Sequence, residues 1–351
     1  MNKKVLIASI FMLTVVMIFS SVSGTVADVD KYGNVHTGIS ETEFLAAGFE
    51  LGDMLLITMG EQSVQAPFVT TYGDVDRGNP LVRLSGGHVA MALNYANFAK
   101  TYSLEVGSPV SYELVEKGAY LEELEIRNLV RTDVREDYAS DAIFANFREV
   151  TMGEIGANTL YRSCHPSLDD PRAPYAALLV EEAGIKTVIN LSDSNEELRE
   201  FLAYSDYYAS IKESGNMINL NMGVDLLSDE FAAKLKKGLM FMIEKEPPYL
   251  VHCVEGKDRA GMMVAILGAL MGATAEEIYA DYIASYENYY NVEKGTQAYD
   301  AIENIIKGIF KSINHGKEAT DDNVRLIAIR YLMEKAGLSY SQVLALESKL
   351  R

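Results

Sequence analysis

The segment Tyr249-Leu250-Val251-His252-Cys253-Val254-Glu255-Gly256-Lys257-Asp258-Arg259-Ala260-Gly261 decides the fold of the second half of this chain. An apolar run opens the segment and a helix-like run, 262–271, follows it, so the pattern predicts a strand, a short loop and a helix. Such a loop aims successive backbone N–H groups and the positive end of the helix dipole at one point. We therefore predict an anion-binding loop at the end of a strand.

Two side chains of this loop carry chemistry. Cys253 stands at its mouth, where the same field favours a nucleophilic thiolate near neutral pH. Arg259 lies six positions on, and its planar guanidinium suits two phosphate oxygens and the charge that develops on them in a transition state. The other residues predicted to line the phosphate site are Val254, Glu255, Gly256, Lys257, Asp258 and Ala260.

The string His-Cys, five residues and Arg resembles the signature of the cysteine-based protein tyrosine phosphatase superfamily. The Lys-Asp pair before the arginine and the segments 160–163, 184–191 and 281–285 are similar to its bacterial branch, which acts on phosphotyrosine, phosphoserine/threonine and phosphoinositides. The resemblance covers about residues 155–290. It implies phosphomonoester hydrolysis through a phosphocysteine intermediate, with no cofactor and no metal. The implied partner is a phosphorylated protein, peptide or phosphoinositide.

Two loop residues depart from the family pattern. Ala260 stands where the family usually has Thr or Ser, whose hydroxyl helps the cysteine leave when the phosphoenzyme is hydrolysed. Glu255 would repel a dianion if it pointed inward, and would be harmless if it pointed outward into solvent. A weakly active phospholigand-binding module is therefore the alternative function. A rhodanese-like sulfurtransferase is a third, against which the arginine and the following glycine argue.

The resemblance also calls for a general acid that protonates the leaving group. Asp225 lies 28 residues before Cys253, after one predicted strand and before the helix that returns to the cysteine strand, which resembles the placement of the acid in the compact dual-specificity enzymes. Asp258 is the competitor, because the loop aspartate of the Lys-Asp-Arg branch can itself orient or protonate. Asp229 fits the first turn of a helix instead.

Residues 1–27 have the pattern of a secretory signal peptide. Lys3 and Lys4 form a basic region, 5–19 an apolar region, and Thr25-Val26-Ala27 a small-residue cleavage site; cleavage after Gly24 and a retained anchor are alternatives. We expect a secreted or cell-surface protein without a transmembrane segment in the mature chain. Its formal charge changes from −19 to about −21 when the two lysines are lost, which disfavours nucleic acid as a partner.

The order of apolar runs, glycine turns and expected helices divides the rest of the chain into two domains. Residues 28–150 alternate short apolar runs with glycine turns, so we expect a small β-rich domain of unknown role with strands near 53–59, 67–72 and 81–84. Residues 151–351 alternate strands and helices, which predicts an α/β domain with a central, mostly parallel sheet and a helical C-terminal extension, like a dual-specificity phosphatase.

The chain has only two cysteines, so it is no disulfide scaffold. By the resemblance, Cys164 lies near the catalytic face. A low-pKa thiolate outside the cytoplasm is open to oxidation. Cys164 is therefore a candidate redox partner that forms a reversible disulfide with Cys253; a buried, unpaired thiol is the alternative.

Overall fold

The computed structural model describes residues 21–196 and 204–351. It forms two compact units that divide between Arg127 and Asn128, earlier than the expected boundary at 150. The reason is a strand pairing: β8 (Arg148–Glu149) pairs antiparallel with β9 (Leu160–Ser163) and so joins the sheet of the second unit.

The first unit is a sheet of seven antiparallel strands in the order β4-β3-β7-β1-β2-β6-β5. Its strands are β1 (Ser21–Val29), β2 (Val35–Ser40), β3 (Met54–Met59), β4 (Gln62–Pro67), β5 (Pro80–Ser85), β6 (His88–Leu93) and β7 (Pro109–Glu116). Short helical segments connect them: α1 (Glu41–Ala46), η1 (Tyr72–Asp74), α2 (Phe98–Thr101) and α3 (Leu121–Arg127). The expected β-rich domain is confirmed.

This sheet curls into a near-closed barrel. The two edge strands approach just after β4, where Val69 N–H donates to Val82 O at 2.9 Å. Phe44 packs inside against Phe49 and Phe68, with ring centroids 4.6 and 5.1 Å away. The expected strand at 67–72 is wrong, because the Asp74 carboxylate, rather than a neighbouring strand, accepts the N–H groups of residues 70 and 71.

The second unit contains a mixed sheet of five strands in the order β11-β10-β12-β9-β8. Four strands are parallel, namely β9, β10 (Thr187–Asn190), β11 (Met217–Asn219) and β12 (Tyr249–His252), and only β8 is antiparallel. Every residue of β9, β10 and β12 is buried. The predicted mostly parallel sheet is thus confirmed.

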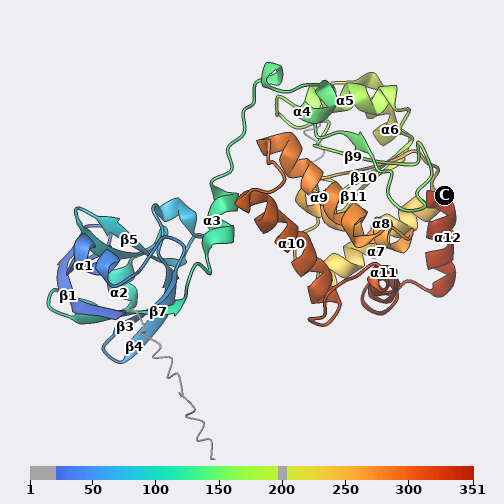
Figure 1. Cartoon of the computed structure of the whole chain (residues 1–351). Helices are drawn as coiled ribbons and strands as arrows, with labels where there is room; N and C mark the ends of the chain where they lie inside the picture. Colours follow the sequence, from blue (N-terminus) through green and yellow to red (C-terminus); the bar gives the residue numbers. More distant parts are fainter. Residues whose placement is uncertain (1–20, 197–203) are drawn as a thin grey trace, which may run out of the picture. The chain divides into compact units, whose positions relative to one another are not determined.

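Helices cover both faces of this sheet (Figure 1). One face packs on α5 (Ala173–Glu182) and α6 (Asp206–Glu213), and the other on α7 (Asp229–Glu244) and α8 (Asp258–Leu270). The predicted C-terminal helices are also present. They comprise α9 (Ala275–Tyr290), α10 (Gln297–Ile313), α11 (Val324–Arg330), the π-helical turn Tyr331–Lys335 and α12 (Tyr340–Leu350), while α4 (Asp141–Phe144) and η2 (Arg135–Asp137) precede the sheet.

The sequence also predicts two helix caps, Ser228 before two acidic residues and Thr274 three residues before Glu277, and both are present. The Ser228 hydroxyl accepts the Phe231 N–H at the start of α7, and Thr274 begins α9 with a capping box. The sequence further predicts a helix over 193–204. Residues 193–196 form none, and the Asp193 side chain is hydrogen-bonded to His165 and Asn190; residues 197–203 lie outside the described residues.

The expected signal peptide lies mostly in residues 1–20, outside the described residues. Its last part, 21–27, belongs to β1, which pairs with β7 on one side and β2 on the other. In the portion of the chain that the structure describes, no helix has both the length and the apolar character needed to cross a bilayer.

Candidate active site

The predicted strand, loop and helix around Cys253 form as expected. β12 runs between β10 and β9 at the centre of the sheet and ends at His252, and α8 begins at Asp258. Cys253 is the first residue beyond the strand and is 3% exposed. It therefore lies at the carboxyl end of a parallel sheet, where open α/β folds place their ligands.

The backbone carbonyls of residues 254–257 all face away from the centre of the loop. The carbonyls of 254–256 accept hydrogen bonds from other elements, in order from His165 N–H (3.0 Å), the Asn146 and Tyr289 side chains (2.9 Å each) and the Arg162 guanidinium (2.7 Å). Lys257 O accepts the Gly261 N–H in the first turn of α8 (2.9 Å) and the Arg162 guanidinium (3.0 Å). In a trans peptide the next N–H points the opposite way. The N–H groups of 255–258 thus face the inner side, and no acceptor in the described ranges contacts them. This is an anion nest.

Two glycines of the motif make this loop possible. Gly256 has φ +67°, and a Cβ there would lie 2.0 Å from the carbonyl oxygen of Ser163 on β9. Gly261 lets α8 approach α9, since a Cβ would lie 2.8 Å from the ring of Tyr282. The loop therefore needs glycine for a left-handed backbone at one position and for close packing at the other.

A buried ion pair supports the loop from behind. The Arg162 side chain is inaccessible to solvent and donates to the carbonyls of Gly256 (2.7 Å) and Lys257 (3.0 Å). Its Nη1 lies 2.5 Å from Asp281 Oδ2 on α9, and the other carboxylate oxygen lies 2.9 Å from Arg148 Nε. Burial raises the pKa of Asp281, but the two arginines outweigh it and the pKa is lowered.

Arg259 connects the loop to the segment that carries Asp225. Its Nη1 donates to the carbonyl of Met222 at 3.2 Å, in the connection between β11 and α7. The Asp225 side chain is exposed on the same connection, where it accepts only the Leu227 N–H (3.1 Å) among the bonds of the described residues. Asp258, the competing acid, lies at the start of α8 and accepts the hydroxyl of Tyr286 at 3.3 Å.

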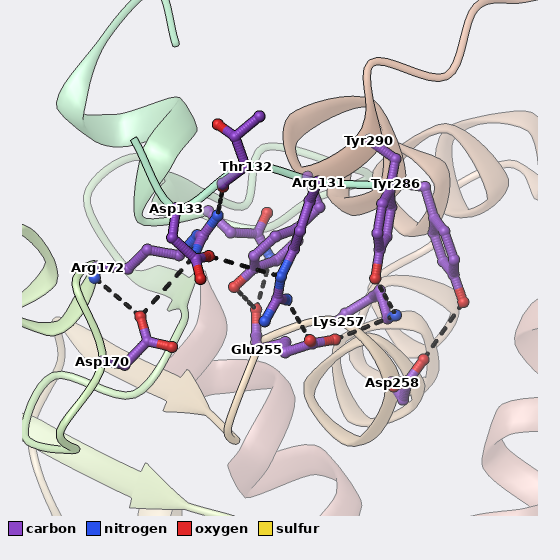
Figure 2. A network of polar contacts seen from close by, with 12 residues as sticks. Arg131, Thr132, Asp133, Asp170, Arg172, Glu255, Lys257, Asp258, Tyr286 and Tyr290 are labelled. Atoms are coloured by element: carbon purple, nitrogen blue, oxygen red, sulfur yellow. Dashed lines mark hydrogen bonds and ion pairs between the residues drawn. The ribbon is translucent and has the colours of Figure 1, made fainter. Parts of the chain in front are cut away.

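Glu255 points away from the anion nest. Its carboxylate pairs with Arg131 on one side and with Lys257 Nζ, 3.1 Å away, on the other (Figure 2). Of the two orientations considered from sequence, the outward one is observed, but the carboxylate is ion-paired and not simply solvated. Lys257 in turn lies over the rings of Tyr286 and Tyr290, 4.7 and 5.2 Å from their centroids.

Two buried histidines lie beside the loop. His165 Nδ1 accepts the Ser167 N–H at 3.1 Å, so the proton is on Nε2, which donates to Asp193 at 2.6 Å. Burial raises the pKa of Asp193, but the bonds from His165 and Asn190 outweigh it and lower the pKa, so this carboxylate is ionised and cannot serve as an acid. Burial lowers the pKa of His252 well below its usual value, which keeps that ring neutral.

Cys164 follows β9, and its sulfur is a free thiol, as is that of Cys253. Burial raises the pKa of the Cys164 thiol, so it is protonated at neutral pH. The redox pairing with Cys253 stays a prediction. Within residues 21–196 and 204–351, no group of three or more His, Cys, Asp or Glu is arranged to hold a metal ion.

The residues that hold the loop in place were not all recognisable from sequence. Arg162 and Asp281 lie in segments quoted for the resemblance, but their roles in holding the loop did not follow from it. An arginine inside a buried strand is a signal that could have indicated a structural ion pair. Asn146, Arg148 and Tyr289 carry no such local signal.

Comparison with known proteins gives the family to which this chain belongs. The model of the tyrosine phosphatase family matches residues 144–351, and the chain therefore belongs to this family, whose members hydrolyse phosphoric monoesters. The first unit matches a different model, that of the SAM hydroxide adenosyltransferase C-terminal domain, over residues 24–111.

Similar solved structures cover parts of the chain. An uncharacterized conserved protein from Thermotoga maritima is 31% identical over 26% of this chain and 36% of its own, with a TM-score of 0.26. This chain thus spans about a third of that relative. The core catalytic domain of the PP-IP phosphatase SIW14 from S. cerevisiae is 21% identical over 49% of this chain and 93% of its own, with a TM-score of 0.29. P. aeruginosa TpbA is 18% identical over 49% and 88%, with a TM-score of 0.29.

Proposed function

We propose that this protein hydrolyses phosphomonoesters through a phosphocysteine intermediate. The observation that carries the proposal is the set of outward carbonyls at 254–257, since it leaves four N–H groups directed at the space beside Cys253. A tetrahedral anion with equatorial oxygens fits such a nest, and negative charge that develops on those oxygens is stabilised without reorganisation of the loop.

In the proposed reaction the Cys253 thiolate attacks phosphorus in line with the leaving oxygen. An S–P bond forms, the P–O bond breaks, and an acid gives its proton to the leaving oxygen. Water then attacks the phosphocysteine, the same carboxylate accepts a proton from it, and the S–P bond breaks to return the thiolate and release phosphate. Arg259 and the loop amides hold the phosphoryl oxygens in both steps.

We assign the acid to Asp225. It is exposed on the connection that Arg259 contacts through Met222, so it is free to approach a leaving group bound in front of the loop. Asp258 is engaged by the hydroxyl of Tyr286 on the side of α9, an arrangement that supports a structural role for this carboxylate.

The proposed substrates are phosphotyrosine and, as finer alternatives, phosphoserine/threonine or a phosphoinositide or inositol phosphate. Lys257 contributes positive charge to the loop, but its ammonium is paired with Glu255 and packed on two tyrosine rings. Turnover of a phosphotyrosine peptide, a phosphoserine peptide, a phosphoinositide and phytate, compared side by side, distinguishes these classes.

The experiment that tests the mechanism is Cys253→Ser. We expect complete loss of turnover with retained binding of inorganic phosphate, and covalently bound ³²P at Cys253 when the wild type is denatured during turnover. Full turnover by the serine variant would refute the proposal. The second candidate, a phospholigand-binding module, is favoured by Ala260; it predicts phosphate binding with negligible turnover in the wild type.

We also propose that the protein acts outside the cytoplasm, on the strength of the signal-peptide pattern. Cleavage after Ala27 or Gly24 would cut β1, which pairs with two neighbouring strands from Ser21 onward. We therefore expect the mature chain to retain Ser21. N-terminal sequencing of protein from the producing cell would test this, and a mature start at residue 28 would contradict it.

A further inference from the structure

A segment just before the phosphatase region contacts the catalytic loop. Residues 128–134 connect α3 to η2 and form neither helix nor strand. They belong to the second compact unit but precede residue 144, where the family match begins. Their contacts with the loop are therefore a feature of this chain outside the stretch that it shares with the family model.

Arg172, just before α5, fixes the position of this segment. Its side chain is 1% exposed, and its guanidinium donates to Thr132 O at 2.5 Å and to Asp133 Oδ1 at 2.6 Å. The Tyr138 hydroxyl donates to the same carbonyl of Thr132 at 2.8 Å. The Arg172 guanidinium also lies 4.6 Å from the centroid of the Phe144 ring. A buried cation thus anchors two consecutive residues of the connection (Figure 2).

The anchored segment brings Arg131 to the catalytic loop. The Arg131 guanidinium lies over the ring of Tyr289, 5.0 Å from its centroid, and its Nη1 pairs with Glu255 Oε1. Lys257 pairs with the other oxygen of this carboxylate at 3.1 Å. Burial raises the pKa of Glu255, but Lys257 and Arg131 outweigh it and lower the pKa, so the side chain is ionised.

An ionised carboxylate two residues after the nucleophile would hinder an anion-binding loop. If Glu255 turned towards the amide face, it would repel a phosphate dianion and compete for the same N–H groups. The structure instead holds it in a row of alternating charges, Arg131, Glu255 and Lys257, whose sum is one positive charge. Arg131 supplies the cation from outside the loop.

We propose that Arg131 is a positioning residue of the phosphatase site, which keeps the Glu255 carboxylate away from the amide face so that the loop can hold a phosphate dianion. The inference rests on the proposed function of the loop. It also assigns a role in phosphate affinity to residues 128–134 of the second unit, because the bonds of Arg172 to Thr132 and Asp133 fix the position of Arg131.

The test compares Arg131→Met with the double variant Arg131→Met/Glu255→Gln in the full chain. The single variant should raise KM and the Kd for inorganic phosphate about tenfold, which is the usual size of coupling between neighbouring groups. Its kcat should change less. The double variant should return both constants to within about threefold of the wild type, because a neutral amide does not repel the dianion.

Arg135→Met is the matched control. Arg135 is the first residue of η2, directly after the segment 128–134, and it donates to Asp141 and to the Tyr138 carbonyl. In the described part of the chain it contacts no residue of the loop. Its variant should keep the wild-type KM and phosphate affinity. An unchanged KM and phosphate Kd in Arg131→Met would overturn the inference. A double variant whose KM and Kd are as high as those of the single variant would also overturn it, because Arg131 would then only shape the segment 128–134. A wild type that neither binds phosphate nor turns over would instead refute the proposed function, and the inference with it.

Discussion

Arg162 and Asp281 form a buried ion pair, 2.5 Å between Nη1 and Oδ2, that joins the strand β9 to the helix α9. The same guanidinium holds the carbonyls of Gly256 and Lys257, so the pair turns two peptide groups of the catalytic loop outward. Arg148 contributes a second cation to the carboxylate. The shape of the anion site therefore depends on a charge carried by a helix that is distant in sequence.

Asp281→Asn should destabilise the second unit by about 3–5 kcal/mol, because the buried Arg162 and the half-buried Arg148 lose their counter-charge. The free energy of unfolding from urea titrations followed by far-UV circular dichroism would measure it. Glu154→Gln is the control, since Glu154 pairs with Arg351 at the surface with 67% of its side chain exposed, and we expect a change within about 0.5 kcal/mol. Equal effects of the two substitutions would contradict this account.

Gly256→Ala should abolish phosphate binding and turnover. The added Cβ would meet the Ser163 carbonyl at 2.0 Å in a backbone with φ +67°, so the loop must open. Isothermal titration with phosphate or vanadate would detect the loss. Gly308→Ala in α10, where a Cβ meets nothing within 4 Å, should instead stabilise the protein by about 0.5–1 kcal/mol and leave turnover unchanged.

Ala260→Ser should raise steady-state turnover without changing the rate of the first phosphoryl transfer. A hydroxyl at this position can assist the thiolate to leave in the second step, which the alanine cannot. Ala260 is fully buried. Compared with Ser, a Thr side chain at this position would add a methyl group at a cost of about 1–3 kcal/mol in packing strain, so Ser is the better test. Stopped-flow burst kinetics with p-nitrophenyl phosphate separate the two steps. An unchanged ratio of burst to steady-state rate would rule this role out.

Asp225→Asn should slow the release of poor leaving groups far more than good ones. An alkyl phosphate needs a proton on its leaving oxygen, whereas p-nitrophenolate leaves without one. We expect a loss of about 10²–10⁴-fold in kcat/KM for the alkyl ester and a much smaller loss for the nitrophenyl ester. If Asp258→Asn gives this pattern and Asp225→Asn does not, the assignment of the acid is wrong.

The stability of the second unit should decrease as the pH falls below about 6.5, the ordinary pKa of histidine. Burial lowers the pKa of His252, so below this pH the unfolded chain binds a proton that the native ring does not. Between pH 7.5 and 5.5 the expected loss is about 1.4 kcal/mol. The lowered pKa of Asp193 affects stability only near and below pH 3.8, outside this window. A free energy of unfolding that does not change between pH 7.5 and 5.5 would contradict the buried neutral state of His252.

Local patterns predicted the parts of the structure that depend on neighbours in sequence. The strand before Cys253, the loop and α8 formed as expected, because a short apolar run, a glycine in the turn and the start of a helix each depend on only a few neighbouring residues. The caps at Ser228 and Thr274 are of the same kind. The strand expected at 67–72 failed because a single side chain, Asp74, took the hydrogen bonds that a neighbouring strand would have made.

Residues distant in sequence supplied what the pattern could not show. The donors to the loop carbonyls come from Asn146, Arg162, His165 and Tyr289, on elements that approach the loop only after the sheet and helices have packed. Three tyrosines of α9, Tyr282, Tyr286 and Tyr289, are buried in the core. The hydroxyl of Tyr289 also donates to Glu255 O, and Lys257 lies over the rings of Tyr286 and the half-buried Tyr290.

By itself, the sequence determined which atoms are proposed to do the chemistry. One sulfur, one guanidinium and a run of peptide groups lie within seven consecutive residues and need only a strand and a helix at their ends. The tertiary structure alone decided which way those peptide groups face and where the charge of Glu255 lies. Both depend on a counter-charge or hydrogen-bond donor brought from another element, such as Asp281 behind Arg162 or Arg131 beside Glu255. Such pairings depend on distance in space, which no local pattern of residues records.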